Sequence, residues 1–210
     1  MCGEVGQIRE WSITDGSCSP SDFWDLGHKL FNSTPLTFPI KFIEGDIFDD
    51  SVFHLSLPSY TFPQLPAPPL PKLGNSLNFL RHHVSVIYVS AVFHLFSEDE
   101  QLQLGRKLGA LLSPLPGSMI LGSHIGMATA GIKTETLGGI KEMFCHSPES
   151  WCALWDGVVF EKGTVEVRAV LSDAVEISST ATMQPFEERG PDTSERWRTT
   201  SWLRWNVVRI

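Results

Sequence analysis

The sequence predicts an α/β fold in which a mostly parallel sheet is covered by helices and ends in an antiparallel pair of strands. Short apolar, β-branched segments alternate with helical segments that begin at serine caps. The last two segments are both strands, which is typical of an antiparallel edge. At 42% hydrophobic residues the chain can build one sizeable core, so residues 1–210 are interpreted as a single domain.

The first part of the chain contains one helix, one strand and one long loop. Ser19-Pro20-Ser21-Asp22 predicts a helix that starts with Ser19 as its N-cap and runs to about Phe31. The short apolar segment Ile40 to Ile43 stops at a Glu-Gly-Asp turn, which predicts a buried strand. Six prolines between Pro58 and Pro71 exclude regular structure, so a proline-rich loop is expected over residues 56–78 within the domain.

The second part alternates strands and helices. Residues 84–91 predict a buried strand, and the capping box at Ser97 predicts a helix that ends before Pro114. Its apolar stripe consists of Leu104, Leu108, Leu111 and Leu112. Further elements are expected at 118–122 (strand), 147–157 (helix), 164–171 (strand) and 202–210 (strand). Segments 40–43, 84–91 and 118–122 should be neighbouring parallel strands.

Composition excludes several classes of function. The net charge is −8 without a cluster of Lys or Arg, so nucleic acid is not expected as a partner. No apolar stretch reaches the roughly 18 residues of a membrane helix, and the N-terminus does not resemble a signal peptide, so a soluble, cytoplasmic protein without membrane contact is expected. The four cysteines form no C-x-x-C pair, and no metal site is predicted.

Ligands of open parallel sheets bind beyond the carboxyl ends of the strands, which directs attention to the turns there. Asp46, directly after the segment 40–43, could accept a hydrogen bond from an amino group such as the exocyclic amine of adenine. The alternative is that Asp46 only caps its own turn, and taken without context this alternative is favoured. The residues 122–126, after the third strand, could line a substrate pocket or form an ordinary loop.

Histidine and tryptophan side chains suggest further candidates, each with a structural alternative. His94 follows the strand 84–91 and could act as a general base, but a histidine between Phe93 and Leu95 is more often a packing residue. Four tryptophans on predicted helix and strand faces could stack on a ligand, although aromatic residues in such positions usually belong to the core. They are Trp151, Trp155, Trp202 and Trp205.

The order of several motifs resembles fungal class I-like S-adenosylmethionine-dependent methyltransferases, many of which act in secondary metabolism. The resemblance runs from about Phe23 to Ile210. It depends on the segments FWDLGHKLF (23–31), KFIEGDIFD (41–49), VSVIYVSAVFHLFSEDEQ (84–101), LLSPLPGSMILGSH (111–124), FCHSPESWCALWDGVVF (144–160) and the terminal WNVVRI. It implies a Rossmann-like sheet, S-adenosylmethionine as cofactor and a small-molecule substrate.

The resemblance also implies roles for individual residues. In such enzymes the Gly-Asp after the third sheet strand contacts adenine, which corresponds to Asp46 and Ile47. The end of the fourth strand approaches the methionine part of the cofactor, which corresponds to Val89, Ser90 and Ala91. The helix that begins at Ser147 and the loops before it would face the substrate, and the candidate substrate-binding residues are His124, His146 and Trp151.

Two features of the family have no counterpart in this sequence. No segment matches the strand and glycine-rich turn that hold the methionine end of the cofactor, so the sheet is expected to be N-terminally incomplete. Where the family has an acidic residue for the ribose hydroxyls, this chain has Ser17 and Cys18, of which Cys18 is taken as the candidate cofactor contact. Neither residue supplies a carboxylate.

The predicted function is methylation of a small secondary metabolite, with oxygen as the expected acceptor atom. Methyl transfer from a sulfonium needs alignment of the reactants more than it needs catalytic side chains, so His94 is the one catalytic candidate. The alternative is a truncated, inactive methyltransferase-like remnant or a partner-binding protein. The methyl acceptor and the oligomeric state are left open by the sequence.

Overall fold

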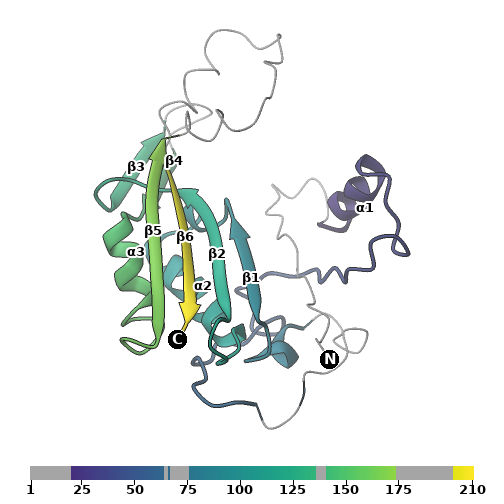
Figure 1. Ribbon diagram of the computed structural model, residues 1–210. Coiled ribbons are helices and arrows are strands. Elements are labelled where there is room, and N and C mark those ends of the chain that lie inside the picture. The colour runs from purple at the N-terminus through teal and green to yellow at the C-terminus, as the bar shows by residue number, and fades with distance from the viewer. Residues whose placement is uncertain (1–19, 64–65, 67–75, 136–140, 174–200) are drawn as a thin grey trace, which may run out of the picture.

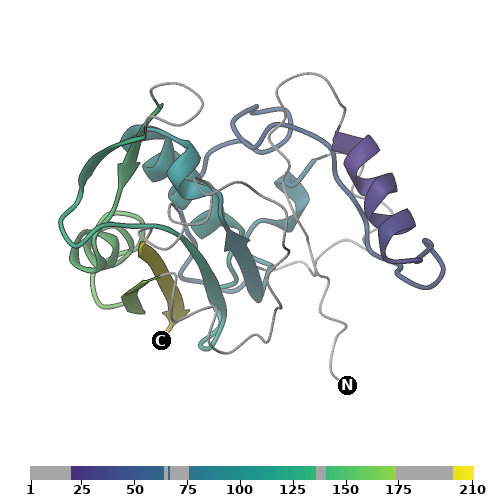
Figure 2. The ribbon, with the colours of Figure 1, turned by 90° about the horizontal axis from the view of Figure 1, so that it is seen from above.

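The computed structural model describes residues 20–63, 66, 76–135, 141–173 and 201–210, and Figures 1 and 2 show their arrangement. The helices are α1 (Pro20–Leu30), α2 (Glu98–Leu111) and α3 (Pro148–Trp155), with short 3₁₀ turns η2 (Asn78–Leu80) and η3 (Phe93–Leu95). The strands are β1 (Val86–Ser90), β2 (Met119–Ile125), β3 (Gly131–Glu135), β4 (Lys141–Cys145), β5 (Val165–Asp173) and β6 (Ser201–Arg209).

A four-stranded sheet with the order β1-β2-β6-β5 forms the centre of the molecule. β1 and β2 are parallel, with Tyr88 opposite Leu121. β6 is antiparallel to both of its neighbours, β2 and β5. The α/β class, the parallel pairing of segments 84–91 and 118–122, and the antiparallel pair at the end of the chain are therefore confirmed.

The prediction of a strand at Ile40–Ile43 is wrong. These residues form no strand, although Ile43 is buried in the core. A four-residue apolar segment becomes a strand only when a neighbouring strand completes its hydrogen bonds, and among the described residues β1 pairs with β2 alone. Phe42 instead stacks on Trp24 of α1, with 5.1 Å between the ring centroids and 15° between the planes.

Two further differences concern the middle of the chain. β2 continues to Ile125, so His124 lies within the strand and not in the turn expected at 122–126. The antiparallel hairpin of β3 and β4 was not predicted, because its sequences GIKTE and KEMFC lack a run of β-branched or aromatic residues. Of the loop predicted at residues 56–78, the described residues 56–63, 66, 76 and 77 contain neither helix nor strand, and Asn78 begins η2.

The predicted helix starts are confirmed where the structure describes them. Ser97 and Ser147 both make capping boxes, with Glu100 and Ser150 as the respective partners. Ser19, the predicted cap of α1, lies outside the described residues. None of the described helices has the length and hydropathy that crossing a lipid bilayer requires.

Helices α2 and α3 cover one face of the sheet (Figures 1 and 2). Leu104 and Leu108 of α2 are 3% and 5% exposed, as the predicted apolar stripe requires. Beneath α3, Trp151, Trp155, Trp205 and Phe93 form an aromatic cluster, in which the Trp151 ring lies 4.8 Å from Phe93 and 4.9 Å from Trp205. These tryptophans belong to the core, as the favoured interpretation held.

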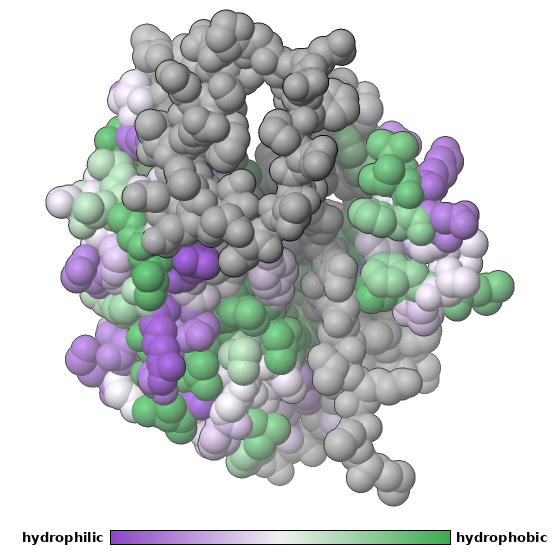
Figure 3. Space-filling view, turned by 45° about the horizontal axis from the view of Figure 1, so that its top comes forward, coloured by the Kyte–Doolittle hydropathy of each residue, from purple (hydrophilic) through white to green (hydrophobic). Residues whose placement is uncertain are grey.

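The opposite face of the sheet is not covered by a described helix. Tyr88 and Val170 are 64% and 60% exposed on it. Helix α1 lies apart from the sheet (Figure 1) and exposes Leu26 and Leu30. Apolar and charged side chains lie side by side on the molecular surface (Figure 3). This face and α1 are two of the places where the fold leaves apolar side chains in contact with water.

Gly122 allows the close contact of β1, β2 and β6. A Cβ atom at this position would overlap the carbonyl oxygen of Val89 and come within 3.2 Å of the Trp205 ring. Since backbone atoms cannot move aside, Gly122→Ala should lower the free energy of unfolding by about 1–3 kcal/mol, measured by urea denaturation. Gly131→Ala is the matched control, because its Cβ would meet nothing within 4 Å. Equal stability of the two variants would contradict this account.

Candidate functional site

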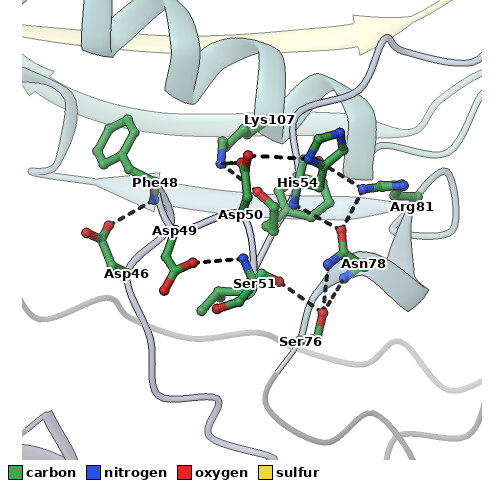
Figure 4. Close-up of polar contacts among 12 residues, drawn as sticks. Asp46, Phe48, Asp49, Asp50, Ser51, His54, Ser76, Asn78, Arg81 and Lys107 are labelled. Carbon is green, nitrogen blue, oxygen red and sulfur yellow. Dashed lines mark hydrogen bonds and ion pairs between the residues drawn. The ribbon is translucent and has the colours of Figure 1, made fainter.

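The turn at residues 45–48 is held in place by its apolar residues. Asp46 Oδ1 accepts a hydrogen bond from the backbone N–H of Phe48 at 2.8 Å (Figure 4). Ile47 is buried in the core, and the Phe48 ring packs edge-on against Phe96 at 5.0 Å. The turn-capping role that was the alternative for Asp46 is therefore present. Because Asp46 is exposed and a carboxylate has several acceptor sites, the side chain can still accept a second donor.

A buried lysine attaches the next residues to helix α2. Lys107 is fully buried, and its Nζ donates to the Phe53 carbonyl oxygen at 2.5 Å and to Asp50 Oδ1 at 3.3 Å (Figure 4). The hydrogen bond from Lys107 lowers the pKa of Asp50 below its usual value. Sequence reasoning missed Lys107, although its position three residues after Leu104, on the face of the leucine stripe, was a signal that it is buried.

A second polar cluster fixes the same segment from the other side (Figure 4). Asn78 Oδ1 accepts from the backbone N–H of His54 at 3.0 Å and from Arg81 at 2.6 Å. Ser76 donates to the carbonyl oxygen of Val52 at 3.1 Å. The segment after Asp46 is thus tied both to α2 and to η2.

The end of β1 contains an unusual backbone conformation. Ala91 has φ of +57°, a left-handed conformation that costs energy for a residue with a side chain. Its N–H donates to the carbonyl oxygen of Ser123 at 2.7 Å, and Ser90 Oγ lies 3.0 Å from Ser123 Oγ. The chain turns sharply at the point where Val89, Ser90 and Ala91 were predicted to meet a cofactor.

His94 lies just beyond this turn, in η3. Its Nδ1 accepts a long hydrogen bond, 3.5 Å, from the backbone N–H of Ile125. Burial is the largest cause that lowers the pKa of His94, so the imidazole is neutral near pH 7. With Nδ1 as acceptor, the proton of the neutral ring is on Nε2. In this state Nε2 can donate a hydrogen bond but cannot take up a proton.

The three predicted substrate residues lie together, but inside the protein. His124 and His146 are 1% and 4% exposed, and their rings lie 4.5 and 5.1 Å from the Trp151 ring. His124 Nδ1 accepts from Trp205 Nε1 at 3.0 Å, and His146 Nδ1 lies 2.9 Å from Ser150 Oγ. All three side chains pack in the core. That they bind substrate stays a prediction. Cys18 lies outside the described residues.

The structure thus brings the Asp46 turn to the loop that follows β1, through the contact of Phe48 with Phe96. A separate depression of about 460 Å³ lies on the uncovered face of the sheet, where Tyr88, Arg168 and Arg204 contribute to its walls. Ligands of open α/β sheets bind beyond the carboxyl ends of the strands, so the turn at the end of β1 and the adjacent Asp46 turn are the candidate site of this α/β protein.

Comparisons with known proteins give relatives of one kind. The O-methyltransferase phiE from a fungal species is 28% identical over 142 residues, which is 68% of this chain and 39% of that protein. The methyltransferase adrK from Penicillium rubens is 26% identical over 166 residues, 75% of this chain and 51% of that protein. The Asnovolin E/Chermesin D methyltransferase nvfJ from Aspergillus novofumigatus is 34% identical over 93 residues, 43% of this chain and 33% of that protein.

The chain is similar to these fungal methyltransferases and spans between a third and about half of the length of each. No family model matches it. A crystal structure described as an S-adenosylmethionine-dependent methyltransferase from Listeria monocytogenes aligns with 62% of this chain and 63% of that chain, at 9% identity and a TM-score of 0.38. So weak a likeness carries no argument.

Acid should destabilise the protein through its buried histidines. Burial lowers the pKa of His124 to about 3 and that of His146 to about 4, against 6.5 when exposed. As the pH falls below 6.5, the unfolded chain takes up protons that the folded chain does not, so stability present above pH 6.5 is lost. Two such groups predict a slope of roughly 2–3 kcal/mol per pH unit near pH 5. Urea denaturation from pH 7.5 to 5 measures this slope, and His146→Gln should reduce it by about 1 kcal/mol per pH unit. An unchanged slope would show that His146 does not contribute to the acid sensitivity.

Lys107→Met should loosen the segment after Asp46. The variant keeps the aliphatic part of the side chain but leaves the buried carbonyl of Phe53 without its donor, which should cost about 1–3 kcal/mol of stability. Amide hydrogen exchange should accelerate at Val52 and Phe53, whose N–H groups bond within this turn. Lys162→Met is the control: the Lys162 side chain is 81% exposed in its ion pair with Asp156, and the variant should change stability by less than about 1 kcal/mol.

Proposed function

We propose that this chain is part of an S-adenosylmethionine-dependent methyltransferase that methylates a small fungal secondary metabolite at oxygen. The observation that carries the proposal is the position of the Asp46 turn, which packs beside the loop after β1 through Phe48 and Phe96. The names of the relatives support methyl transfer, and that of phiE supports oxygen as the acceptor.

The residues of the turn fit the adenine end of such a cofactor. Adenine presents an exocyclic amine and two flat faces. The exposed carboxylate of Asp46 can accept from the amine, while the partly buried ring of Phe48 offers an apolar surface next to it. Val89, Ser90 and Ala91 would hold the cofactor farther along the same edge. The described residues contain no counterpart of a glycine-rich turn for its methionine end.

When bound, S-adenosylmethionine supplies a methyl group that is already activated by a positive sulfur. The protein then has to align the acceptor and exclude water more than it has to provide a strong base. His94 suits this role, because its Nε2–H can donate to a carbonyl or carboxylate of the substrate and so orient it. With its proton on Nε2, His94 can orient the substrate by donating a hydrogen bond. The same tautomer cannot remove a proton from a substrate hydroxyl through Nε2.

Calorimetric titration with S-adenosylhomocysteine tests the site. The chain of 210 residues should bind it more weakly than micromolar, because two or three hydrogen bonds of the missing glycine-rich turn are each worth roughly 1.5–3 kcal/mol. Micromolar affinity would show that other residues replace that turn. A chain extended at its N-terminus by a strand and a glycine-rich turn of the kind that the resemblance implies should bind measurably.

In the extended chain, Asp46→Ala should weaken binding on the order of tenfold to a hundredfold, because the amine of adenine loses its charged hydrogen-bond acceptor. Asp49→Ala is the matched control, because Asp49 lies in the same segment and makes the same kind of turn contact, with Ser51. If both variants bind like the parent, Asp46 is not in the site. If the extended chain does not bind at all, the alternative of a non-catalytic, partner-binding remnant is favoured.

A further inference from the structure

Gln101 occupies a position of helix α2 at which the pattern of the helix favours an apolar residue. It comes three residues before Leu104 and seven before Leu108, so it lies on the same buried face of the helix. The Gln101 side chain is fully buried. A leucine or methionine at this position would bury more apolar surface, and burial of an amide is costly unless hydrogen bonds offset it. The contacts of Gln101 therefore indicate what the amide does.

The amide of Gln101 donates hydrogen bonds to two separate segments of the chain. Its Nε2 donates to the carbonyl oxygen of Phe96 at 3.0 Å and to that of Phe144 at 2.8 Å. The opposite orientation of the amide would bring its oxygen against two carbonyl oxygens, so the two acceptors fix the orientation. Phe96 ends η3, and Phe144 lies in β4. One side chain thus joins α2, η3 and the β3–β4 hairpin.

The segment that Gln101 holds reaches both parts of the candidate site. The ring of Phe96 packs against Phe48 at 5.0 Å, and His94 lies two residues before Phe96 in η3. His94 Nδ1 accepts from the backbone N–H of Ile125 at 3.5 Å, the limit of a hydrogen bond. A contact this long does not by itself hold the imidazole, so the position of His94 depends on what holds η3.

The second polar atom of Gln101 argues against a purely stabilising role. Among the described residues, Oε1 has no hydrogen-bond partner, although it is buried. A buried acceptor without a partner lowers stability and offsets much of what the two donated bonds contribute. What remains is direction, because the two bonds are formed only when η3 and β4 lie in one arrangement around α2.

We propose that Gln101 is a positioning residue, which fixes η3 against β4 and so determines where the His94 imidazole lies in the candidate site. The importance of this position for a substrate rests on the proposed function, in which His94 orients the methyl acceptor. The attachment itself requires neither cofactor nor substrate, so it can be tested on the unliganded chain.

Nuclear magnetic resonance of the full, unliganded chain tests the proposal with two matched variants. Gln101→Met keeps the length of the side chain and removes both donated bonds. Lys107→Met is the control, because it removes a buried donor to a carbonyl from the same helix, at Phe53 and not at η3. Relative to the amides of β6, exchange of the Ile125 amide should accelerate by at least about tenfold in Gln101→Met. This ratio should not change in Lys107→Met.

Titration of His94 gives a second signal that a general loss of stability would not move. Burial is the largest cause that lowers the pKa of His94 in the parent, and the charge of Lys133 adds to it. If η3 leaves β4, the imidazole gains contact with water, which favours its protonated form. The pKa of His94 should therefore rise toward its ordinary value in Gln101→Met and stay at the parental value in Lys107→Met.

Unchanged exchange at Ile125 and an unchanged His94 titration in a folded Gln101→Met variant would overturn the proposal, as would equal effects of the two variants. If Gln101→Met does not fold, the parent decides. Both side-chain amide protons of Gln101 should then exchange slowly, since each is bonded to a buried carbonyl, and fast exchange of either would overturn the proposal. An extended chain that keeps these signals but binds no S-adenosylhomocysteine would contradict the proposed function and leave the positioning role of Gln101 supported.

Discussion

Aromatic packing beneath α3 holds the sheet and its helices together. Trp151 contacts Phe93 from the end of β1, His124 from β2 and Trp205 from β6, so one side chain joins three strands or their ends to one helix. The approach is possible because Gly122 leaves room for the Trp205 ring. Such a cluster buries much apolar surface, which is the main source of stability in a domain of this size. It also brings imidazoles into the core, where they stay neutral.

The candidate site packs on this core, but side-chain contacts and not strand pairing hold it there. The Asp46 turn has no strand of its own, since residues 40–43 do not join the sheet. Its position depends on Ile47 in the core, on the contact of Phe48 with Phe96, and on the buried ammonium group of Lys107. A buried lysine stabilises little in net terms, because its desolvation offsets its hydrogen bonds. Its effect here is to select one position for the turn.

Patterns that are local in sequence could be predicted. The capping boxes at Ser97 and Ser147 and the leucine stripe of α2 follow from residues three or four positions apart. The strand at 40–43 could not be judged in this way, because an apolar segment becomes a strand only if another strand lies beside it. The same is true of the site: His124 was placed in a loop, whereas the ladder with β6 extends β2 past it. The left-handed backbone conformation of Ala91 could not be predicted either, because alanine has no preference for it.

The order in which the strands appear along the chain affects synthesis. β6 lies between β2 and β5 in the sheet but follows both of them in the sequence. β5 therefore emerges from the ribosome before the strand that pairs with it, and 27 residues separate its end at Asp173 from the start of β6 at Ser201. At about 5–20 residues per second, the backbone N–H and C=O groups of β5 wait on the order of seconds for the strand that pairs with them. Chaperones that bind extended apolar segments have that interval in which to act.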